Sequence, residues 1–286
     1  MKVLLKLLRI KQWIKNIFIL LPAFFGGTLS LIVVNELIIG FFSFSFIASS
    51  IYIINDLSDI EADKQHPKKK NRPIPAGLIS KPKAISISIA LFITSISLSF
   101  FFLSTSFILV LFAYYLLNLA YSTVLKHISL LDIAIVSFGF VFRIIAGGEL
   151  VNVEISFWLL LMTFLFSLFI VIAKRRDDFN VHSSASQIRK VNQYYNLAFL
   201  NTILSMVASL MMVCYIMYTT SSIYFIDQPY WALASCILVI IGLIRYFQAI
   251  YVEENGGSPT EFAIKDNVIK VIVFSWLSIF CYLIYF

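Results

Sequence analysis

The chain has 286 residues, of which 60% are hydrophobic and 13% are charged, and its mean hydropathy is +0.91. Charged residues make up about 25% of soluble domains, so this composition excludes an ordinary water-soluble protein and predicts a polytopic membrane protein. The net charge of +7 could suggest nucleic acid. We expect no nucleic acid partner, because the basic residues gather on one side of the predicted spans, where anionic lipids and phosphorylated substrates account for them.

Nine apolar segments follow one another along the chain. Segments of about 20 residues are long enough to cross a hydrocarbon core of about 30 Å. We therefore expect an all-α membrane protein with a single domain over residues 1–286. The predicted spans lie near 16–34, 37–54, 84–103, 107–121, 131–148, 157–173, 197–219, 231–250 and 268–285.

The loops between these spans differ in charge. Outside the spans, the Lys and Arg residues lie in the amino-terminal arm and in the loops after spans two, four, six and eight. In the opposite loops all the charged residues are acidic, namely Glu36, Glu149, Glu154 and Asp227. By the positive-inside rule, the amino terminus and the basic loops are predicted to face the cytosol.

The stretch from Asn55 to Asp63, at the end of span two, is the strongest chemical signal. If it continues as a helix at about 100° per residue, Asn55, Asp56, Asp59 and Asp63 share one arc of about 100°. Three carboxylates on one stripe repel one another unless a cation lies among them, and hard oxygen ligands suit Mg²⁺, which often also binds phosphates. The alternative interpretation is an ordinary acidic helix end.

Residues 66–73, which we call the basic strap, follow directly and contain Lys69, Arg72 and two further lysines. Pro73, Pro75 and Gly77 break regular structure, so we expect the strap to bend back across the cytosolic end of the helices. A metal site beside a set of anion-binding residues, both at a membrane surface, predicts chemistry on a diphosphate.

The fifth predicted span contains a basic residue at depth. Arg143 lies eleven residues after Asp132, hence about 16 Å deeper in a helix and within about 20° of the same face. An arginine near the midplane costs at least a few kcal/mol and normally faces the interior or a wet cavity. The sequence leaves open a substrate contact, an internal salt bridge or a hydrogen-bond network. Gly147 and Gly148 indicate close helix packing.

Other polar candidates lie at predicted span ends, where each has an ordinary interfacial alternative. The loop after span six contains Lys174, Arg175, Asp177 and Asp178, which form either a positive-inside anchor or a second phosphate clamp. The remaining candidates are Lys15 and Asn16 in the amino-terminal arm and Tyr121, Ser122, Lys126 and His127 at the end of span four.

The acidic motif Asn55-Asp56-x-x-Asp59-x-x-x-Asp63, followed by His66-Pro67-x-Lys69-x-x-Arg72-Pro73-Ile74, resembles the first acidic motif of the UbiA superfamily of intramembrane prenyltransferases. Tyr121-Ser122-x-x-Leu125-Lys126 resembles another of its motifs. The resemblance covers essentially the whole chain. It implies nine helices around a central cavity open to the cytosol, in a bacterial inner membrane.

Further stretches narrow the resemblance, namely Gln12-Trp13-x-Lys15-Asn16, Leu131-Asp132-Ile133, Arg143 to Gly148, Ala173-Lys174-Arg175, Gly257-x-Pro259-x-Glu261 and Asp266. Together they resemble the decaprenyl-phosphate phosphoribosyltransferase branch. That branch moves a 5-phosphoribosyl group from phosphoribosyl diphosphate to a polyprenyl phosphate. Aromatic prenyltransferases of the superfamily carry a second acid pair four residues apart, whereas Asp177 and Asp178 are adjacent here.

The resemblance implies a Mg²⁺ cofactor, held by Asn55, Asp56, Asp59 and Asp63, with Asp56 and Asp59 as catalytic residues. It also implies substrate-binding roles for Lys15, Asn16, Lys69, Arg72, Tyr121, Lys126, Arg143, Lys174 and Arg175. Two alternatives stay open, an aromatic polyprenyltransferase that uses a prenyl diphosphate and a lipid transporter or flippase. The expected partners are the two substrates and membrane lipids, and assembly as a homo-oligomer is left open.

Overall fold

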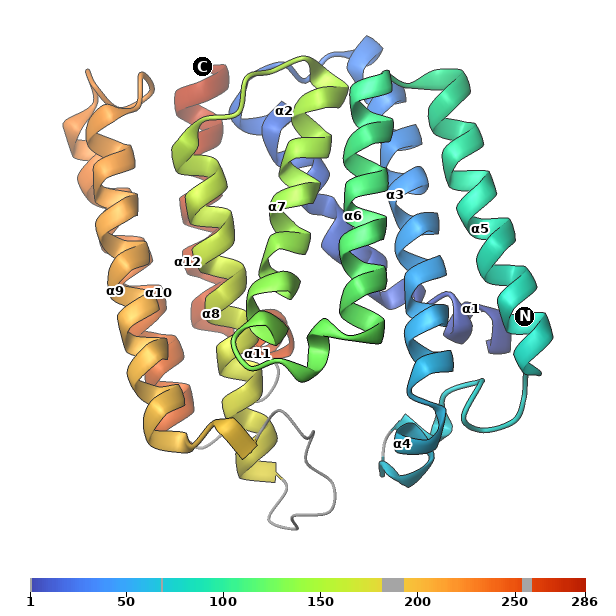
Figure 1. Cartoon of the computed structure of the whole chain (residues 1–286). Coiled ribbons are helices and arrows are strands. Elements are labelled where there is room, and N and C mark those ends of the chain that lie inside the picture. Colours follow the sequence, from blue (N-terminus) through green and yellow to red (C-terminus); the bar gives the residue numbers. More distant parts are fainter. Residues whose placement is uncertain (1, 68, 182–192, 254–258) are drawn as a thin grey trace. The chain divides into compact units, whose positions relative to one another are not determined.

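The computed structural model describes residues 2–67, 69–181, 193–253 and 259–286. All regular elements within these residues are helices (Figure 1), which confirms the all-α fold class. The chain separates into two compact units, residues 1–155 and residues 156–286. That both belong to a single domain stays a prediction.

Unit one contains an irregular amino-terminal segment, four long apolar helices and several short helical turns. Its elements are α1 (Lys2–Leu7), η1 (Ile10–Leu20), α2 (Leu21–Phe25), α3 (Leu31–Ser58), α4 (Ile60–Gln65), η2 (Lys69–Asn71), α5 (Lys81–Phe102), α6 (Thr105–Thr123), η3 (Leu125–His127) and α7 (Leu131–Val151).

The segment predicted as the first span, 16–34, does not form one long α-helix. It comprises part of the 3-10 helix η1, the short α2 and the beginning of α3, which already starts at Leu31. Pro22 lies in the first turn of α2, and Gly27 has a φ of 63°, a conformation that favours glycine and ends the segment. The predicted boundary between spans one and two was therefore wrong, since α3 runs from residue 31 to 58.

Contacts with neighbouring helices stabilise the 3-10 helix η1. Runs of 3-10 helix longer than about four residues are uncommon, and η1 has 11. Asn16 donates from Nδ2 to Ser45 Oγ of α3 at 2.8 Å. Gly147 of α7 leaves room for the η1 backbone, because a Cβ there would lie 2.1 Å from the Ile19 carbonyl oxygen. This close approach confirms the packing role predicted for Gly147.

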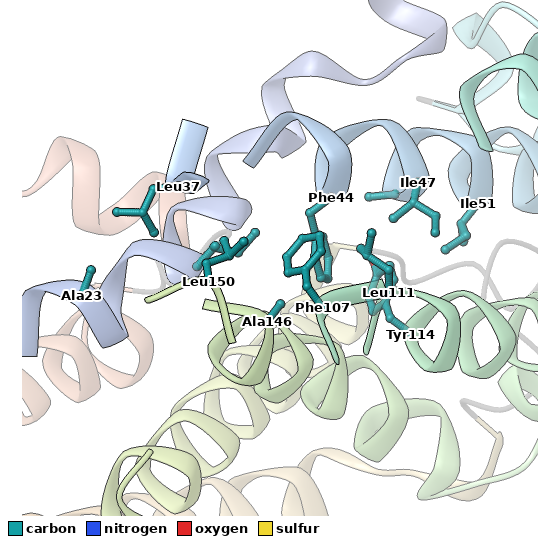
Figure 2. Packing of buried hydrophobic residues seen from close by; sticks show 12 residues of the cluster. Ala23, Leu37, Phe44, Ile47, Ile51, Phe107, Leu111, Tyr114, Ala146 and Leu150 are labelled. Atoms are coloured by element: carbon teal, nitrogen blue, oxygen red, sulfur yellow. The ribbon is translucent and has the colours of Figure 1, made fainter. Parts of the chain in front are cut away.

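The apolar core of unit one lies between α3, α6 and α7 (Figure 2). The buried rings of Phe44 and Tyr114 have centroids 4.6 Å apart. Leu150 packs against Gly40, and a Cβ at Gly40 would lie 2.3 Å from Cδ1 of Leu150. This packing holds the three helices together and thereby fixes the polar residues at their shared end.

Unit two contains α8 (Phe157–Val181), α9 (Leu197–Ser221), α10 (Pro229–Tyr251), α11 (Pro259–Lys265) and α12 (Asn267–Tyr285). The last seven predicted spans correspond to α5–α10 and α12, with ends that differ by a few residues in most cases. The exception is α8, which extends to residue 181. Lys174–Asp178, predicted as a loop, therefore lie on this helix.

Eight described helices, α3, α5–α10 and α12, are long and apolar enough to cross a membrane. Their outward side chains are largely apolar, as with Phe100 of α5 and Phe274 of α12, which are 71% and 72% exposed. Such surfaces suit lipid rather than water. The chain is an integral membrane protein, and a ninth crossing by η1 and α2 stays a prediction.

Candidate active site

The acidic motif lies where α3 gives way to α4. Asp56 occupies the last turn of α3, Asp63 lies in α4, and Asp59 lies between the two helices with φ −103° and ψ 12°. The Asp59 N–H donates to the Asn55 carbonyl at 3.0 Å, and the Asp63 N–H donates to the Asp59 carbonyl at 2.8 Å. The chain keeps a nearly helical course, but the continuous helix on which the predicted single stripe depended is broken at Asp59.

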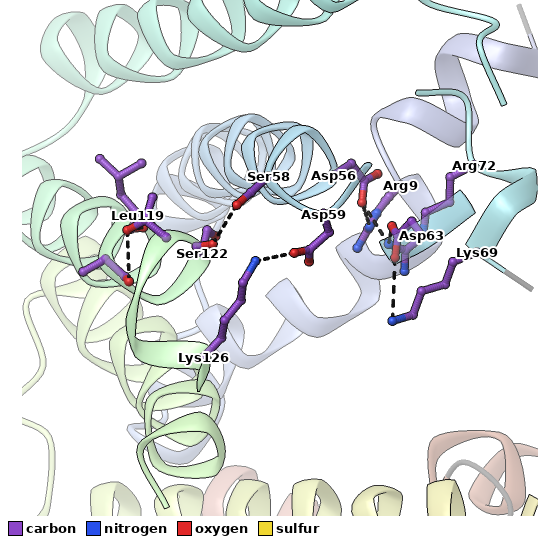
Figure 3. A network of polar contacts seen from close by, with 12 residues as sticks. Arg9, Asp56, Ser58, Asp59, Asp63, Lys69, Arg72, Leu119, Ser122 and Lys126 are labelled. Carbon is purple, nitrogen blue, oxygen red and sulfur yellow. Dashed lines mark hydrogen bonds and ion pairs between the residues drawn. The ribbon is translucent and has the colours of Figure 1, made fainter. Parts of the chain in front are cut away.

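Asp56 and Asp63 converge on the basic strap (Figure 3). Arg72 Nη1 donates to Asp56 Oδ1 at 2.9 Å and to Asp63 Oδ2 at 2.6 Å. Lys69 Nζ lies 3.8 Å from Asp63 Oδ1. Arg9, from the turn between α1 and η1, donates to Asp56 Oδ1. Lys69 and Arg72 of the strap thus reach back to the acidic residues, and a course across the cytosolic end of the helices stays a prediction.

Asp59 points to a different partner (Figure 3). Its Oδ1 accepts a hydrogen bond from Lys126 Nζ of η3, whose side chain is 9% exposed. Ser58 Oγ donates to the Ser122 carbonyl of α6 at 3.2 Å. The single carboxylate stripe that the sequence predicted is therefore divided into a pair, Asp56 and Asp63, and a separate Asp59 on the α6 side.

The Asp56–Asp63 pair fits a hard divalent cation. Both carboxylates are buried, and buried carboxylates need positive charge beside them. Arg72 Nη1, which contacts both, stands in for a cation that the two would share. In the part of the chain that the structure describes, no three His, Cys, Asp or Glu side chains lie close enough to hold one ion.

Arg9 was not among the predicted site residues. In the sequence it is one of several basic residues of the amino-terminal arm, and 47 positions separate it from Asp56, so no spacing could reveal the contact. Burial lowers the pKa of Arg9, and the neighbouring Asp56 carboxylate opposes this shift. An arginine nevertheless stays protonated in proteins, so Arg9 brings a permanent positive charge to Asp56.

Arg143 lies in a buried hydrogen-bond network with neutral groups. Its guanidinium donates to Asn16 Oδ1 at 2.8 Å, to the Gly139 carbonyl at 2.6 Å and to Tyr114 Oη at 3.3 Å. It also lies over the Phe44 ring, 4.9 Å from the centroid. Of the three possibilities the sequence left open, the hydrogen-bond network is confirmed, and a contact with substrate stays a prediction.

Lys15 is the half-buried neighbour of Asn16 on η1. Burial, together with the smaller effect of the positive charges of Arg143 and Arg9, lowers the pKa of Lys15 to about 8. Below that pH, Lys15 adds a positive charge to the permanent charge of Arg143, and both groups are then suited to bind an anion.

The remaining predicted residues of unit one lie at the same ends of α3, α6 and α7. Asn55 is half-buried in the last turn of α3. Tyr121 is half-buried in the last turn of α6, and Asp132 is buried in the first turn of α7. Their substrate or metal contacts stay predictions.

Unit two carries the second basic cluster on α8. Lys174 is exposed, Arg175 is buried and Asp177 is half-buried. Arg176 donates to Asn201 Oδ1 of α9 at 2.7 Å, a contact that anchors the end of α8. The side chain of Asp178 lies outside the described residues.

Asp266, also part of the predicted motif set, caps a helix. Its Oδ1 accepts the Ile269 N–H at 2.9 Å at the start of α12, and Arg245 Nη2 donates to its Oδ2 at 2.8 Å. The hydrogen bond from Arg245 lowers the pKa of Asp266. Gly257 and the side chain of Glu261 lie outside the described residues.

Comparisons with known proteins agree with these features. A model of the UbiA prenyltransferase family matches residues 17–267. The chain is 34% identical to a decaprenyl-phosphate phosphoribosyltransferase of Corynebacterium glutamicum, over 97% of this chain and 85% of that protein. It is 33% identical to a protein of the same name from Mycolicibacterium smegmatis, over 99% of this chain and 92% of that protein.

Solved structures show a similar fold. A UbiA homolog from Archaeoglobus fulgidus bound to DMAPP and Mg²⁺ has a TM-score of 0.72 at 17% identity, covering 98% of both chains. The same homolog bound to GPP and Mg²⁺ has a TM-score of 0.70, covering 98% of this chain and 96% of that chain. At this identity the likeness shows the fold alone.

Proposed function

This chain belongs to the UbiA prenyltransferase family, as its acidic motif predicted, and we propose that it transfers a 5-phosphoribosyl group from phosphoribosyl diphosphate to a polyprenyl phosphate. The observation that carries this proposal is the nearly full-length similarity to proteins named decaprenyl-phosphate phosphoribosyltransferase. The chain is accordingly a transferase.

The reaction we propose is a substitution at C1 of the ribose. The bond between C1 and the diphosphate oxygen breaks, an oxygen of the lipid phosphate forms the new bond to C1, and diphosphate leaves. The lipid phosphate is already an anion, so the site needs no strong general base. Positioning and electrostatic stabilisation supply most of the acceleration.

Asp56 and Asp63 are the residues we propose to hold Mg²⁺, with Asn55 assisting. Asp59, the fourth proposed ligand, would have to leave Lys126 to join them. When bound, the ion would neutralise charge on the leaving diphosphate. The metal-bound UbiA homologs support this assignment through the fold they share with the chain. Asp56 and Asp59 stay the proposed catalytic residues.

The basic side chains are proposed to hold the two anionic substrates against their mutual repulsion. Lys69, Arg72 and Lys126 already pair with carboxylates of the acidic motif, so they lie where a diphosphate held by the metal would be. The other proposed substrate-binding residues are Lys15, Asn16, Tyr121, Arg143, Lys174 and Arg175.

We propose that the protein lies in a bacterial inner membrane with its amino terminus and acidic motif toward the cytosol. The charge distribution supports this orientation, because the basic arm, the strap and η3 all supply positive groups to one end of unit one. Phosphoribosyl diphosphate, a water-soluble substrate, would then reach the acidic motif directly.

A paired-substrate assay tests the proposed reaction. Purified protein in nanodiscs receives Mg²⁺ with labelled phosphoribosyl diphosphate and decaprenyl phosphate, or Mg²⁺ with a prenyl diphosphate and 4-hydroxybenzoate. We expect a phosphoribosylated lipid only in the first arm, and its loss with EDTA. Product only in the second arm would establish an aromatic prenyltransferase instead, and lipid flux in proteoliposomes without product would establish a transporter.

A further inference from the structure

Three basic side chains cover the two buried carboxylates of the acidic motif (Figure 3). The side chains of Asp56 and Asp63 are 2% and 3% exposed, whereas those of Arg9, Lys69 and Arg72 are 20%, 26% and 28% exposed. An incoming ligand therefore meets the positive groups before it meets the carboxylates.

The backbone of Arg9 directs its side chain toward this cluster. Arg9 has φ 51° and ψ 47°, a left-handed conformation that residues other than glycine rarely adopt. Such a conformation persists where surrounding contacts hold it. Two contacts do so here, the ion pair with Asp56 and the approach of the guanidinium to the Tyr52 ring, 5.0 Å from its centroid.

The charges of this cluster disfavour a metal ion that binds alone. Two carboxylates face three basic groups, so a divalent cation would add to a local excess of positive charge and would compete with Arg9 and Arg72 for the same oxygens. A diphosphate that arrives with the metal reverses this balance, because its oxygens can accept the hydrogen bonds that the guanidinium groups leave.

We propose that Arg9 is a substrate-binding residue that exchanges partners. Before substrate binds, Arg9 neutralises the buried Asp56. When the divalent cation takes that carboxylate, Arg9 moves onto the diphosphate that accompanies the metal. The inference rests on the proposed function only in requiring a diphosphate donor, and no covalent bond changes in the exchange.

A purely structural role for Arg9 predicts something different. In that case the Arg9–Asp56 pair would persist in every state, and its removal would weaken metal and diphosphate binding together or not at all. Partner exchange instead predicts opposite effects, since Arg9 competes with the metal but assists the diphosphate.

Metal binding to the full-length protein distinguishes the two roles. Electron paramagnetic resonance measures the concentration of free Mn²⁺ with and without inorganic diphosphate. A titration without protein corrects for the Mn²⁺–diphosphate complex. In the wild type, we expect diphosphate to increase Mn²⁺ affinity. Arg9→Gln should bind Mn²⁺ alone roughly tenfold more tightly, the size of effect expected from one charge-assisted contact, and should bind diphosphate more weakly.

Two further variants complete the design. Arg9→Lys keeps the positive charge and should resemble the wild type. Lys64→Gln removes a nearby charge on α4 that pairs with the exposed Glu61, so it should change neither affinity. Size-exclusion profiles establish that each variant is folded.

Two results would overturn the proposal. The first is an Arg9→Gln variant whose affinity for Mn²⁺ alone is unchanged or lower. The second, which needs no variant, is a wild-type protein in which diphosphate fails to raise Mn²⁺ affinity. Because the probe is inorganic diphosphate, a failure of phosphoribosyl transfer would reject the proposed function without deciding this one.

Discussion

Replacing Gly147 with alanine tests the contact that holds η1 against α7. The added Cβ would lie 2.1 Å from the Ile19 carbonyl oxygen and 3.0 Å from Pro22 Cδ. Carbon–oxygen contacts are ordinarily about 3.3–3.6 Å, so the backbone of η1 must move by about 1.2–1.5 Å. A backbone oxygen cannot rotate away as a side chain can.

Two opposed effects set the sign of the change. Alanine is more favourable than glycine inside a helix by about 0.8–1.0 kcal/mol. Overpacking of a core costs about 1–3 kcal/mol and sometimes more, and a backbone clash belongs at the upper end of that range. We therefore expect Gly147→Ala to lose about 1–2 kcal/mol of stability on balance.

Thermal unfolding in detergent, followed by intrinsic fluorescence, measures the effect. A loss of 1 kcal/mol lowers Tm by about 2–4 °C in domains of 150–250 residues, so we expect a shift of about 2–8 °C. Turnover should fall as well, because η1 carries Asn16, which binds Arg143.

Gly139→Ala is the matched control on the same helix. Its Cβ would lie 3.6 Å from Arg143 Nη1 and 3.7 Å from the Tyr114 ring, which are ordinary contacts. This variant should be neutral or slightly more stable than the wild type. If Gly147→Ala unfolds at the temperature of Gly139→Ala, the close approach of η1 does not hold the site.

The remaining predictions concern the acidic motif and Lys15. Asp59→Asn should nearly abolish turnover while the protein still inserts, and near-normal activity would reject its catalytic role. Lys126→Gln should also lower turnover, and because Lys126 and Asp59 form one pair, the double variant should lose less than the sum of the single losses in a double-mutant cycle. Burial and the charges of Arg143 and Arg9 give Lys15 a pKa of about 8, so its positive charge is present below that pH and lost above it. The KM for a phosphate substrate should therefore rise as the pH passes through 8, and a KM of Lys15→Met that rises equally would show that another group is responsible.

Much of the fold could be predicted because hydrophobic length is a strong signal in membrane proteins. The predicted span 131–148 corresponds to α7, residues 131–151, since a run of apolar residues with few charges has few other structures available. The η1 segment could not be predicted in the same way. Its eleven residues include Lys11, Gln12, Lys15 and Asn16, so hydrophobic length is a weak signal there, and tertiary contacts such as the Asn16–Ser45 hydrogen bond support a 3-10 helix.

The candidate site could be predicted where its contacts are local in the chain. Asp63 and Arg72 are nine residues apart, and the prolines after the strap indicated that it bends back across the end of the helices that carries the acidic motif. Arg9 could not be found, because its contact with Asp56 depends on how α1 packs beside α3. The break at Asp59 was missed because helical periodicity alone does not reveal a one-residue interruption.

The ion pairs of the basic strap also bear on how the protein is made. Loop closure costs little entropy for short separations, and Arg72 reaches both Asp63 and Asp56 within 16 residues. Arg9 precedes all of them, so this charged cluster can assemble during translation once residue 72 has emerged, before α5 enters the bilayer. The Lys126–Asp59 pair forms later, because Lys126 is synthesised 54 residues after Arg72.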